Sequence, residues 1–416
     1  MEKFMITDRS TELGALLTNS VAGSKSPCAR FGPRRVLQAS SGSTAVTNHY
    51  GKSSAKPAIS SPERSLKRKQ GSANKMSKSN NGFGVLDKIG IKRFGKLSAP
   101  GVMATVYEGL DTTADQKVAI KKVAVNDLWF TNLERGETEG LKATKHPNIA
   151  KTRTLVVQHK AKSDTKGEYL VITDYEQVRK IPKETFREYK VELVVSDFIE
   201  GENLQVLIED EALPDANVPM AIRIGIDVAS GLSCLHNNNI IHRDLKPGNI
   251  MWNSQSEQFQ LIDFGFSKSV GKEDLTKTSC GSGKYLAPEM IKVIYGRRGV
   301  SGYGQKLDVW ALGATLMGIA GGKTPESFSE KGVVDTPRIG QDFRNILYFG
   351  ELNDQEKMDY IKRYFNDVYL ESPGLVDLII LTLRGNPNER ITAAKACEFL
   401  TLLRDNPTLR FPLTSA

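Results

Sequence analysis

The sequence predicts an α+β fold with two lobes, a small strand-rich N-terminal lobe and a larger helical C-terminal lobe. Three observations support this class. Short β-type runs fill residues 84–198, helical patterns dominate residues 199–405, and the sequence contains no internal repeat. Together they predict one folded domain over residues 84–405, preceded by a segment of different composition.

The elements of this domain follow from the spacing of its apolar residues. Apolar runs predict strands at residues 84–89, 104–110, 117–123, 153–158, 168–173 and 190–198. Helical spacing predicts helices at residues 131–144, 219–236, 307–319, 356–364, 374–383 and 393–403. The strands come first and most helices follow them, which divides the domain into its two lobes.

Composition is that of a globular protein of 416 residues, with 39% hydrophobic and 25% charged residues. No unbroken apolar run approaches the roughly 18 residues of a membrane-spanning helix, so no membrane span is expected. The four cysteines lie far apart without a CxxC pair, which argues against a disulfide framework or a zinc site. These features favour a reducing intracellular compartment.

Residues 1–80 differ from the rest in charge. They are rich in Ser and hold 14 Lys or Arg against 4 Asp or Glu, whereas the remaining 336 residues carry a net charge of −1. This basic tail lacks apolar periodicity, so we expect it to be disordered and to be the one region suited to nucleic-acid contact. A cytoplasmic or nuclear location fits the basic cluster at residues 64–69. Organelle targeting is an alternative, because no acidic residue occurs between Glu12 and Glu63, and a solvated basic linker is the simplest interpretation.

The strongest motif is the string HRDLKPGN at residues 242–249, followed 14 residues later by DFG at residues 263–265. Phosphoryl transfer requires a metal ion against the phosphates, a carboxylate that orients the attacking hydroxyl, and positive charge near the migrating group. Carboxylate, amide and lysine side chains on these two loops can supply such groups. The string resembles the catalytic and metal-binding loops of eukaryotic-type serine/threonine protein kinases, and the chain is identified as a divergent member of that family.

The resemblance implies an ATP-dependent enzyme that requires Mg²⁺ and transfers the γ-phosphate of ATP to Ser or Thr hydroxyls of protein substrates. It implies Asp244 as the catalytic base and Lys246 as the contact to the transferred phosphate. It also implies Asn249 and Asp263 as Mg²⁺ ligands. The alternative is a pseudokinase-like scaffold with weak ATP binding, and the oligomeric state is left open.

The motif VAIK at residues 118–121 resembles the strand whose lysine contacts the α- and β-phosphates of ATP. Taken alone, it would suit an ordinary buried strand that ends in a surface lysine. Its position, with Lys121 lying 123 residues before Asp244 and HPNI between them, favours the kinase interpretation.

This lysine needs a carboxylate partner on the next helix. Family spacing makes Glu137 that partner, with Glu139 as the alternative. Leu141 follows Glu137 by one helical turn on the same face, so we expect it to pack toward Phe264 and His242.

The phosphate-binding loop departs from the family pattern. Spacing back from Val106 retains Gly101 as the one glycine of the usual three in GxGxxGxV. Glycine lets backbone amides approach phosphates closely, so the missing glycines predict weaker ATP binding rather than none.

The adenine is expected at a hinge, where the backbone groups of Asp197 and Ile199 would hydrogen-bond the base beside a small Ser196. An edge strand without a ligand is the alternative.

The segment GSGKYLAPE at residues 281–289 resembles the end of a kinase activation segment. In it Ser282 is expected to bridge Asp244 and Lys246, which together with Lys246 favours serine/threonine over tyrosine specificity. The resemblance also pairs Glu289 with Arg390.

Two further residues carry implied roles around the catalytic loop. Asp308 matches the helix residue that braces this loop. Arg243 suggests control by phosphorylation of the activation segment, because a basic pocket is satisfied by phosphate. The candidate acceptors are Thr276, Thr278 and Ser279, and ordinary solvated loop hydroxyls are the alternative.

One stretch is longer than the family usually needs. His146 to Ser196 spans 50 residues, and the excess falls near residues 160–190. Long loops in compact domains tend to be functional or mobile, so this insertion predicts either a partner or regulatory surface or an inert addition.

Overall fold

The computed structural model describes eleven stretches of the chain: residues 82–97, 104–123, 136–142, 146–159, 169–181, 189–210, 218–270, 276, 281–296, 302–328 and 341–413. All of them belong to one compact unit, Asn74–Ala416. The predicted basic tail at residues 1–80 and the loop glycine Gly101 lie outside the described residues.

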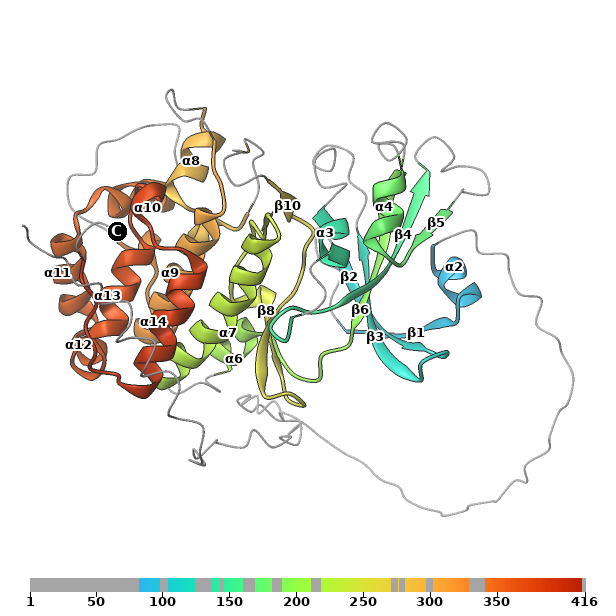
Figure 1. Cartoon of the computed structure of the whole chain (residues 1–416), viewed down its shortest axis with the longest axis horizontal. Coiled ribbons are helices and arrows are strands. Elements are labelled where there is room, and N and C mark those ends of the chain that lie inside the picture. Colours follow the sequence, from blue (N-terminus) through green and yellow to red (C-terminus); the bar gives the residue numbers. More distant parts are fainter. Residues whose placement is uncertain are drawn as a thin grey trace, which may run out of the picture. The chain divides into compact units, whose positions relative to one another are not determined.

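The first half of this unit is built on one antiparallel sheet (Figure 1). Its strands are β1 (Ile91–Lys96), β2 (Ala104–Asp111), β3 (Gln116–Val123), β4 (Thr152–His159), β5 (Tyr169–Ile172) and β6 (Tyr189–Asp197). Their order in the sheet is β1-β2-β3-β6-β4-β5. Where this half is described, three short helices accompany the strands: α2 (Gly82–Lys88), α3 (Gly136–Lys142) and α4 (Tyr175–Lys180).

Side chains of the central strands alternate between two apolar clusters on opposite faces of the sheet. Val156 of β4 joins the cluster that includes Phe83 of α2, whereas its neighbours Leu155 and Val157 join the cluster that includes Leu141 of α3. Successive residues of a strand point to opposite faces, so a continuous apolar run is what a sheet covered on both faces requires.

One predicted strand is wrong. Residues 84–89 were expected to be extended, yet they fall largely within helix α2, and the first strand is β1 at Ile91–Lys96. Phe83 and Leu86 are buried and stand three positions apart, which places both on the helix face that packs against the sheet. Short apolar runs do not distinguish a helix from a strand, and packing decided this one.

The second half is mainly helical (Figure 1). Its helices are α6 (Leu204–Glu209), α7 (Val218–Asn237), α8 (Pro288–Ile294), α9 (Lys306–Gly321), α10 (Gln341–Glu351), α11 (Asp354–Tyr364), α12 (Asn366–Glu371), α13 (Pro373–Thr382) and α14 (Ala393–Asp405). Two small antiparallel pairs join β7 (Ile240–Ile241) to β10 (Lys268–Ser269) and β8 (Ile250–Asn253) to β9 (Gln258–Leu261). The predicted two-lobed α+β kinase fold is confirmed.

The C-terminal lobe is organised around a single large apolar cluster to which α7 and α9 contribute most of their length. Helix α9 is buried at nearly every position from Leu307 to Ala320, as expected for a helix that is apolar on all sides. Among the described residues, α7 alone is long and apolar enough to cross a membrane, and 56% of its most apolar window is buried inside the protein. Its buried side chains belong to the large apolar cluster of the C-terminal lobe.

Candidate active site

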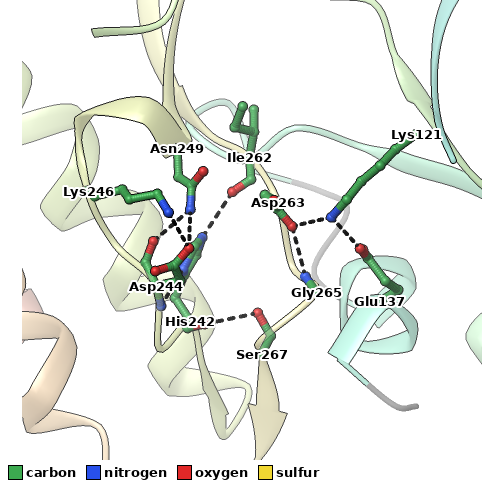
Figure 2. Close-up of polar contacts among 10 residues, drawn as sticks. All are labelled: Lys121, Glu137, His242, Asp244, Lys246, Asn249, Ile262, Asp263, Gly265 and Ser267. Atoms are coloured by element: carbon green, nitrogen blue, oxygen red, sulfur yellow. Dashed lines mark hydrogen bonds and ion pairs between the residues drawn. The ribbon is translucent and has the colours of Figure 1, made fainter. Parts of the chain in front are cut away.

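The catalytic loop between β7 and β8 brings two predicted side chains, those of Lys246 and Asn249, onto the Asp244 carboxylate (Figure 2). Asp244 Oδ2 accepts hydrogen bonds from Lys246 Nζ at 2.8 Å and from Asn249 Nδ2 at 2.9 Å. Asp244 Oδ1 accepts a bond from Ser282 Oγ at 2.7 Å, and Lys246 Nζ also donates to Ser282 Oγ at 2.6 Å. The expected bridge of Ser282 between Asp244 and Lys246 is confirmed.

On the opposite side of the site, Lys121 on β3 lies between two carboxylates (Figure 2). Its Nζ donates to Glu137 Oε1 at 2.8 Å and to Asp263 Oδ1 at 2.5 Å. The alternative partner, Glu139, instead accepts a hydrogen bond from Ser269 Oγ at 2.9 Å. Of the two candidates on α3, Glu137 is therefore the one that pairs with Lys121.

These three charges shift one another's pKa values. Burial alone would lower the pKa of Lys121, but the carboxylates of Asp263 and Glu137 outweigh it and raise this pKa above its usual range. Burial would raise the pKa of Asp263, yet the Lys121 ammonium outweighs it and lowers that pKa. For Glu137 burial dominates and raises the pKa. Lys121 and Asp263 are thus charged at neutral pH, as contacts to phosphate and metal require.

Asp308 on α9 fixes the catalytic loop through hydrogen bonds to its backbone, and its side chain has 0% exposure. Its Oδ1 accepts a hydrogen bond from the Arg243 amide and its Oδ2 from the His242 amide, both at 2.9 Å. His236 Nε2 lies 2.8 Å from Oδ2. Burial would raise the pKa of Asp308, but the hydrogen bond and charge of His236 outweigh it and lower this pKa. The expected bracing role of Asp308 is confirmed.

Backbone conformation also sets these two loops apart. Arg243 and Asp263 have positive φ angles of 67° and 64°, a region that non-glycine residues rarely occupy. Such conformations persist where the surroundings over-determine them, and they cluster at functional sites. The bonds of Asp308 to the catalytic loop and of Lys121 to Asp263 supply that constraint here.

The Arg243 guanidinium is bonded within the protein. It donates to the carbonyl oxygen of Phe266 at 2.5 Å and to the hydroxyl of Tyr303 at 3.2 Å. Thr276 is buried, its hydroxyl accepts a hydrogen bond from Lys268 Nζ at 2.7 Å, and its backbone pairs with that of Tyr303. The other two predicted phosphorylation candidates, Thr278 and Ser279, lie outside the described residues. Phosphorylation of the segment stays a hypothesis.

The pair that follows the activation segment is bidentate and buried. Arg390 Nη1 and Nη2 donate to Glu289 Oε1 and Oε2 at 2.8 and 2.9 Å, and the arginine side chain has 0% exposure. The predicted Glu289–Arg390 pair is confirmed. It ties the start of α8 to the loop before α14.

The nucleotide side of the site is described in part. Val106 of β2 stands opposite Lys121 in the β2–β3 register, which places both on the same stretch of sheet. At the hinge, the Asp197 amide donates to the Lys151 carbonyl oxygen at 2.9 Å. The Asp197 amide is therefore engaged within the protein, and the roles of Asp197 and Ile199 at the adenine stay predictions.

The donor set around Asp263 suits a magnesium ion. The Asn249 amide nitrogen is bonded to Asp244, and no hydrogen bond from the described residues reaches Asn249 Oδ1 or Asp263 Oδ2. Nowhere in the described part of the chain do three or more His, Cys, Asp or Glu side chains gather to hold a metal. A Mg²⁺ ion typically takes one or two protein oxygens and completes its shell with phosphate oxygens and water, so these two side chains fit it.

The predicted position of Leu141 is wrong. Leu141 belongs to the cluster with Leu155 and Val157 of the sheet and not to the cluster of Phe264. Gly140 takes the place near Phe264: an added Cβ would lie 3.2 Å from Phe264 Cδ2. The signal was in the sequence, because a glycine at this helix position lets the backbone come closer than any side chain would allow.

Comparison with known proteins agrees with this geometry. Residues 98–400 match the family described as Protein kinase domain. The chain belongs to this family. Members of the protein kinase family generally use ATP and Mg²⁺.

Curated relatives are serine/threonine-protein kinases. The chain is 28% identical over 309 residues to Serine/threonine-protein kinase ATG1c of Arabidopsis thaliana, covering 73% of this chain and 34% of that protein. It is 28% identical over 247 residues to Serine/threonine-protein kinase 36 of Pongo abelii, covering 58% of this chain and 15% of that protein. With kin-29 of Caenorhabditis elegans the identity is 31% over 243 residues, covering 58% and 25%. This protein kinase thus spans about a third or less of the length of these relatives.

Proposed function

We propose that this protein kinase transfers the γ-phosphate of ATP, with bound Mg²⁺, to Ser or Thr hydroxyls of protein substrates. The observation that carries the proposal is the joint presence of two charged groups of residues, one on each side of the site. Asp244, Lys246 and Asn249 form one group, and Lys121 with Asp263 belongs to the other. Phosphoryl transfer depends mainly on positioning and charge stabilisation, which this arrangement supplies.

Each residue has a distinct task in this reaction. Asp244 orients the acceptor hydroxyl and takes its proton as the oxygen attacks the γ-phosphorus. Lys246 balances negative charge on the migrating phosphoryl group, and Lys121 holds the α- and β-phosphates. Asn249 and Asp263 would hold Mg²⁺, which would supply positive charge to neutralise the phosphate oxygens. The proton of the acceptor hydroxyl stays on the Asp244 carboxylate. ADP leaves with the electron pair of the broken P–O bond.

Serine/threonine specificity is supported by the Lys246–Ser282 contact. Ser282 fixes both the catalytic carboxylate and the lysine beside it, at 2.7 and 2.6 Å. The names of the three relatives, all serine/threonine-protein kinases, agree with this specificity.

A pseudokinase-like scaffold was the alternative, based on the reduced glycine loop. Gly101 lies outside the described residues. A scaffold also has no need to retain Lys121, Asp244, Asn249 and Asp263 together. The catalytic proposal is therefore the better supported of the two.

The test is transfer of labelled phosphate to a generic basic protein, with Mg²⁺ and with excess chelator. Asp244→Asn should lower the rate by roughly 10²- to 10⁴-fold, as expected when a general base is lost. Asp359→Asn, on an exposed surface of α11, is the matched control and should leave the rate unchanged. Equal background rates for wild type and Asp244→Asn would reject the proposal in favour of the scaffold.

We also propose that the catalytic domain spans residues 84–405 behind the tail at residues 1–80, and that the protein acts in the cytoplasm or nucleus. The basic charge of the tail supports this location, with organelle targeting as the competing outcome. Imaging fluorescent fusions with and without residues 1–80 distinguishes these locations. Retention of phosphoryl transfer after removal of residues 1–80 is expected if the domain limits are right.

A further inference from the structure

The described part of the 160–190 insertion forms a strand and a helix beside α3 (Figure 1). Strand β5 adds an outer edge to the sheet by pairing antiparallel with β4, from Leu155–Ile172 to Gln158–Tyr169. Helix α4 follows within three residues of the end of β5. The insertion is therefore part of the packed lobe at these positions.

Helix α4 has one apolar face and one charged face. Tyr175, Val178 and Ile181 recur at a spacing of three and pack against the cluster that contains Leu141 of α3. On the other face, Glu176 and Arg179 form an ion pair with side chains 58% and 65% exposed. This division predicts that the helix is held by its contact with α3 and the sheet.

The N-terminal end of α4 is capped. Asp174 accepts a hydrogen bond from the Glu176 amide at 3.0 Å, and the Thr173 amide donates to the Gln177 side chain at 2.8 Å. Helices this short are not stable alone in water, because the first turn costs more order than its hydrogen bonds return. Capping and docking together account for α4.

Helix α3 is itself poorly suited to hold its position. Its seven described residues include Gly136 and Gly140, and glycine lowers helix stability relative to alanine. These glycines let α3 lie against the DFG loop at residues 263–265. A Cβ on Gly136 would collide with the carbonyl oxygen of Gly265. On the side of Leu141, α3 meets the cluster that α4 helps to form. Helix α3 therefore packs between the DFG loop and the insertion.

Lys142, at the end of α3, extends this contact. Its Nζ lies 5.8 Å from the centroid of the Tyr175 ring, a distance at which a cation and an aromatic face attract each other. The same Nζ donates to the Asn238 carbonyl oxygen, just after α7, at 2.8 Å. One lysine therefore links α4, α3 and the C-terminal lobe.

We propose that β5 and α4 form a built-in brace that positions α3 so that Glu137 stays paired with Lys121. Tyr175 and Val178 are positioning residues: they are not among the residues proposed to hold nucleotide or Mg²⁺, and they act through Leu141 and the helix that it anchors. The expected loss of activity on weakening the brace rests on the proposed kinase function. The expected displacement of α3 does not depend on that function.

The test compares the two faces of α4. Tyr175→Ala and Val178→Ala should each raise hydrogen exchange of the peptide covering residues 136–142 by roughly tenfold, with β6 unchanged. Both should raise the KM for ATP several-fold more than they change kcat, since the phosphate-holding lysine loses its fixed partner. Glu176→Ala and Arg179→Ala, on the exposed face, are the matched controls and should change neither quantity. Tyr175→Phe keeps the ring and should retain the wild-type hydrogen exchange and KM for ATP.

Several outcomes would overturn the brace. Exchange at residues 136–142 that is equal in Tyr175→Ala and Glu176→Ala rejects it, and so does exchange that rises equally in β6, which indicates general loosening of the lobe. If Tyr175→Ala does not fold, Tyr175→Leu gives the same comparison with a smaller loss of volume. If the wild type transfers no phosphate, the proposed function fails while the exchange measurement still decides the brace.

Discussion

The two halves of the active site are built in different ways. The catalytic-loop half rests on the large apolar cluster of the C-terminal lobe, with Asp308 at 0% exposure bonded to two loop amides. The lysine half depends on α3, a helix described over seven residues that contains two glycines. The catalytic loop is positioned by the buried core of the C-terminal lobe. The Lys121–Glu137 pair is positioned by helix α3, which packs between the DFG loop and the insertion.

This difference has a physical consequence. Displacing the catalytic loop would require repacking of a core whose side chains already fill it, which costs stability. Displacing α3 requires breaking the Lys121–Glu137 ion pair, the hydrogen bonds of Glu139 and Lys142, and the contact of Leu141 with the sheet cluster, none of which lies in the large C-terminal core. We therefore expect mutations near the C-terminal half to lower stability, and mutations around α3 to lower activity while the fold is retained.

The largest effect is expected at the buried pair Glu289–Arg390. Glu289→Gln removes one charge and leaves the buried Arg390 guanidinium uncompensated, which should lower the free energy of unfolding by about 3–5 kcal/mol. Denaturant unfolding measures the change. The exposed pair Arg404–Asp405 offers the control, because Arg404→Ala should cost less than about 1 kcal/mol. Similar losses at the two pairs would contradict the role assigned to the core.

A second test of the core uses Lys357, which is 1% exposed. Burial lowers its pKa from 10.5 to about 8. Between these values the unfolded chain binds a proton that the folded protein does not, so the free energy of unfolding should rise with pH from about 8 to 10.5, by up to about 3 kcal/mol. Lys357→Met should lack this rise. Parallel pH profiles for the two proteins would show that the lysine is not buried in solution.

On the lysine side, Glu137→Gln should affect activity. It replaces a charged partner of Lys121 by a neutral one, a loss of about 1.5–3 kcal/mol that corresponds to roughly a ten- to hundredfold drop in kcat/KM. The thermal midpoint should change little. Glu176→Gln, on the exposed face of α4, is the control. A large fall in the midpoint with unchanged kcat/KM would reverse the comparison between the two halves.

The smallest effect is expected for Ser282→Ala. The hydroxyl donates to Asp244 and accepts from Lys246, and losing bonds of this kind costs about 0.5–1.5 kcal/mol, or up to roughly tenfold in kcat. Ser282→Thr keeps the hydroxyl and should retain most of the rate. Steady-state kinetics on a serine peptide decides the matter. An unchanged kcat in Ser282→Ala would indicate that Asp244 and Lys246 hold each other without it.

Much of the site could be predicted because its residues are carried by contiguous strings. HRDLKPGN and DFG place Asp244, Asn249 and Asp263 on two nearby loops, and short loops leave such residues few positions to occupy. Glu137 was named from spacing, and its pairing with Lys121 is present in the structure. Asp308 and the Glu289–Arg390 pair were likewise found from motifs far apart in the chain.

The sequence by itself determined the division into a strand-rich half and a helical half, the chemistry of the two loops and the membership of the protein kinase family. Only the tertiary structure decided that residues 82–88 are helical, that Leu141 faces the sheet cluster, and that the insertion packs beside α3. These points depend on contacts between residues distant in the chain. Local spacing fixes which side chains share a face, but which partner covers that face is set by the packing of the whole lobe.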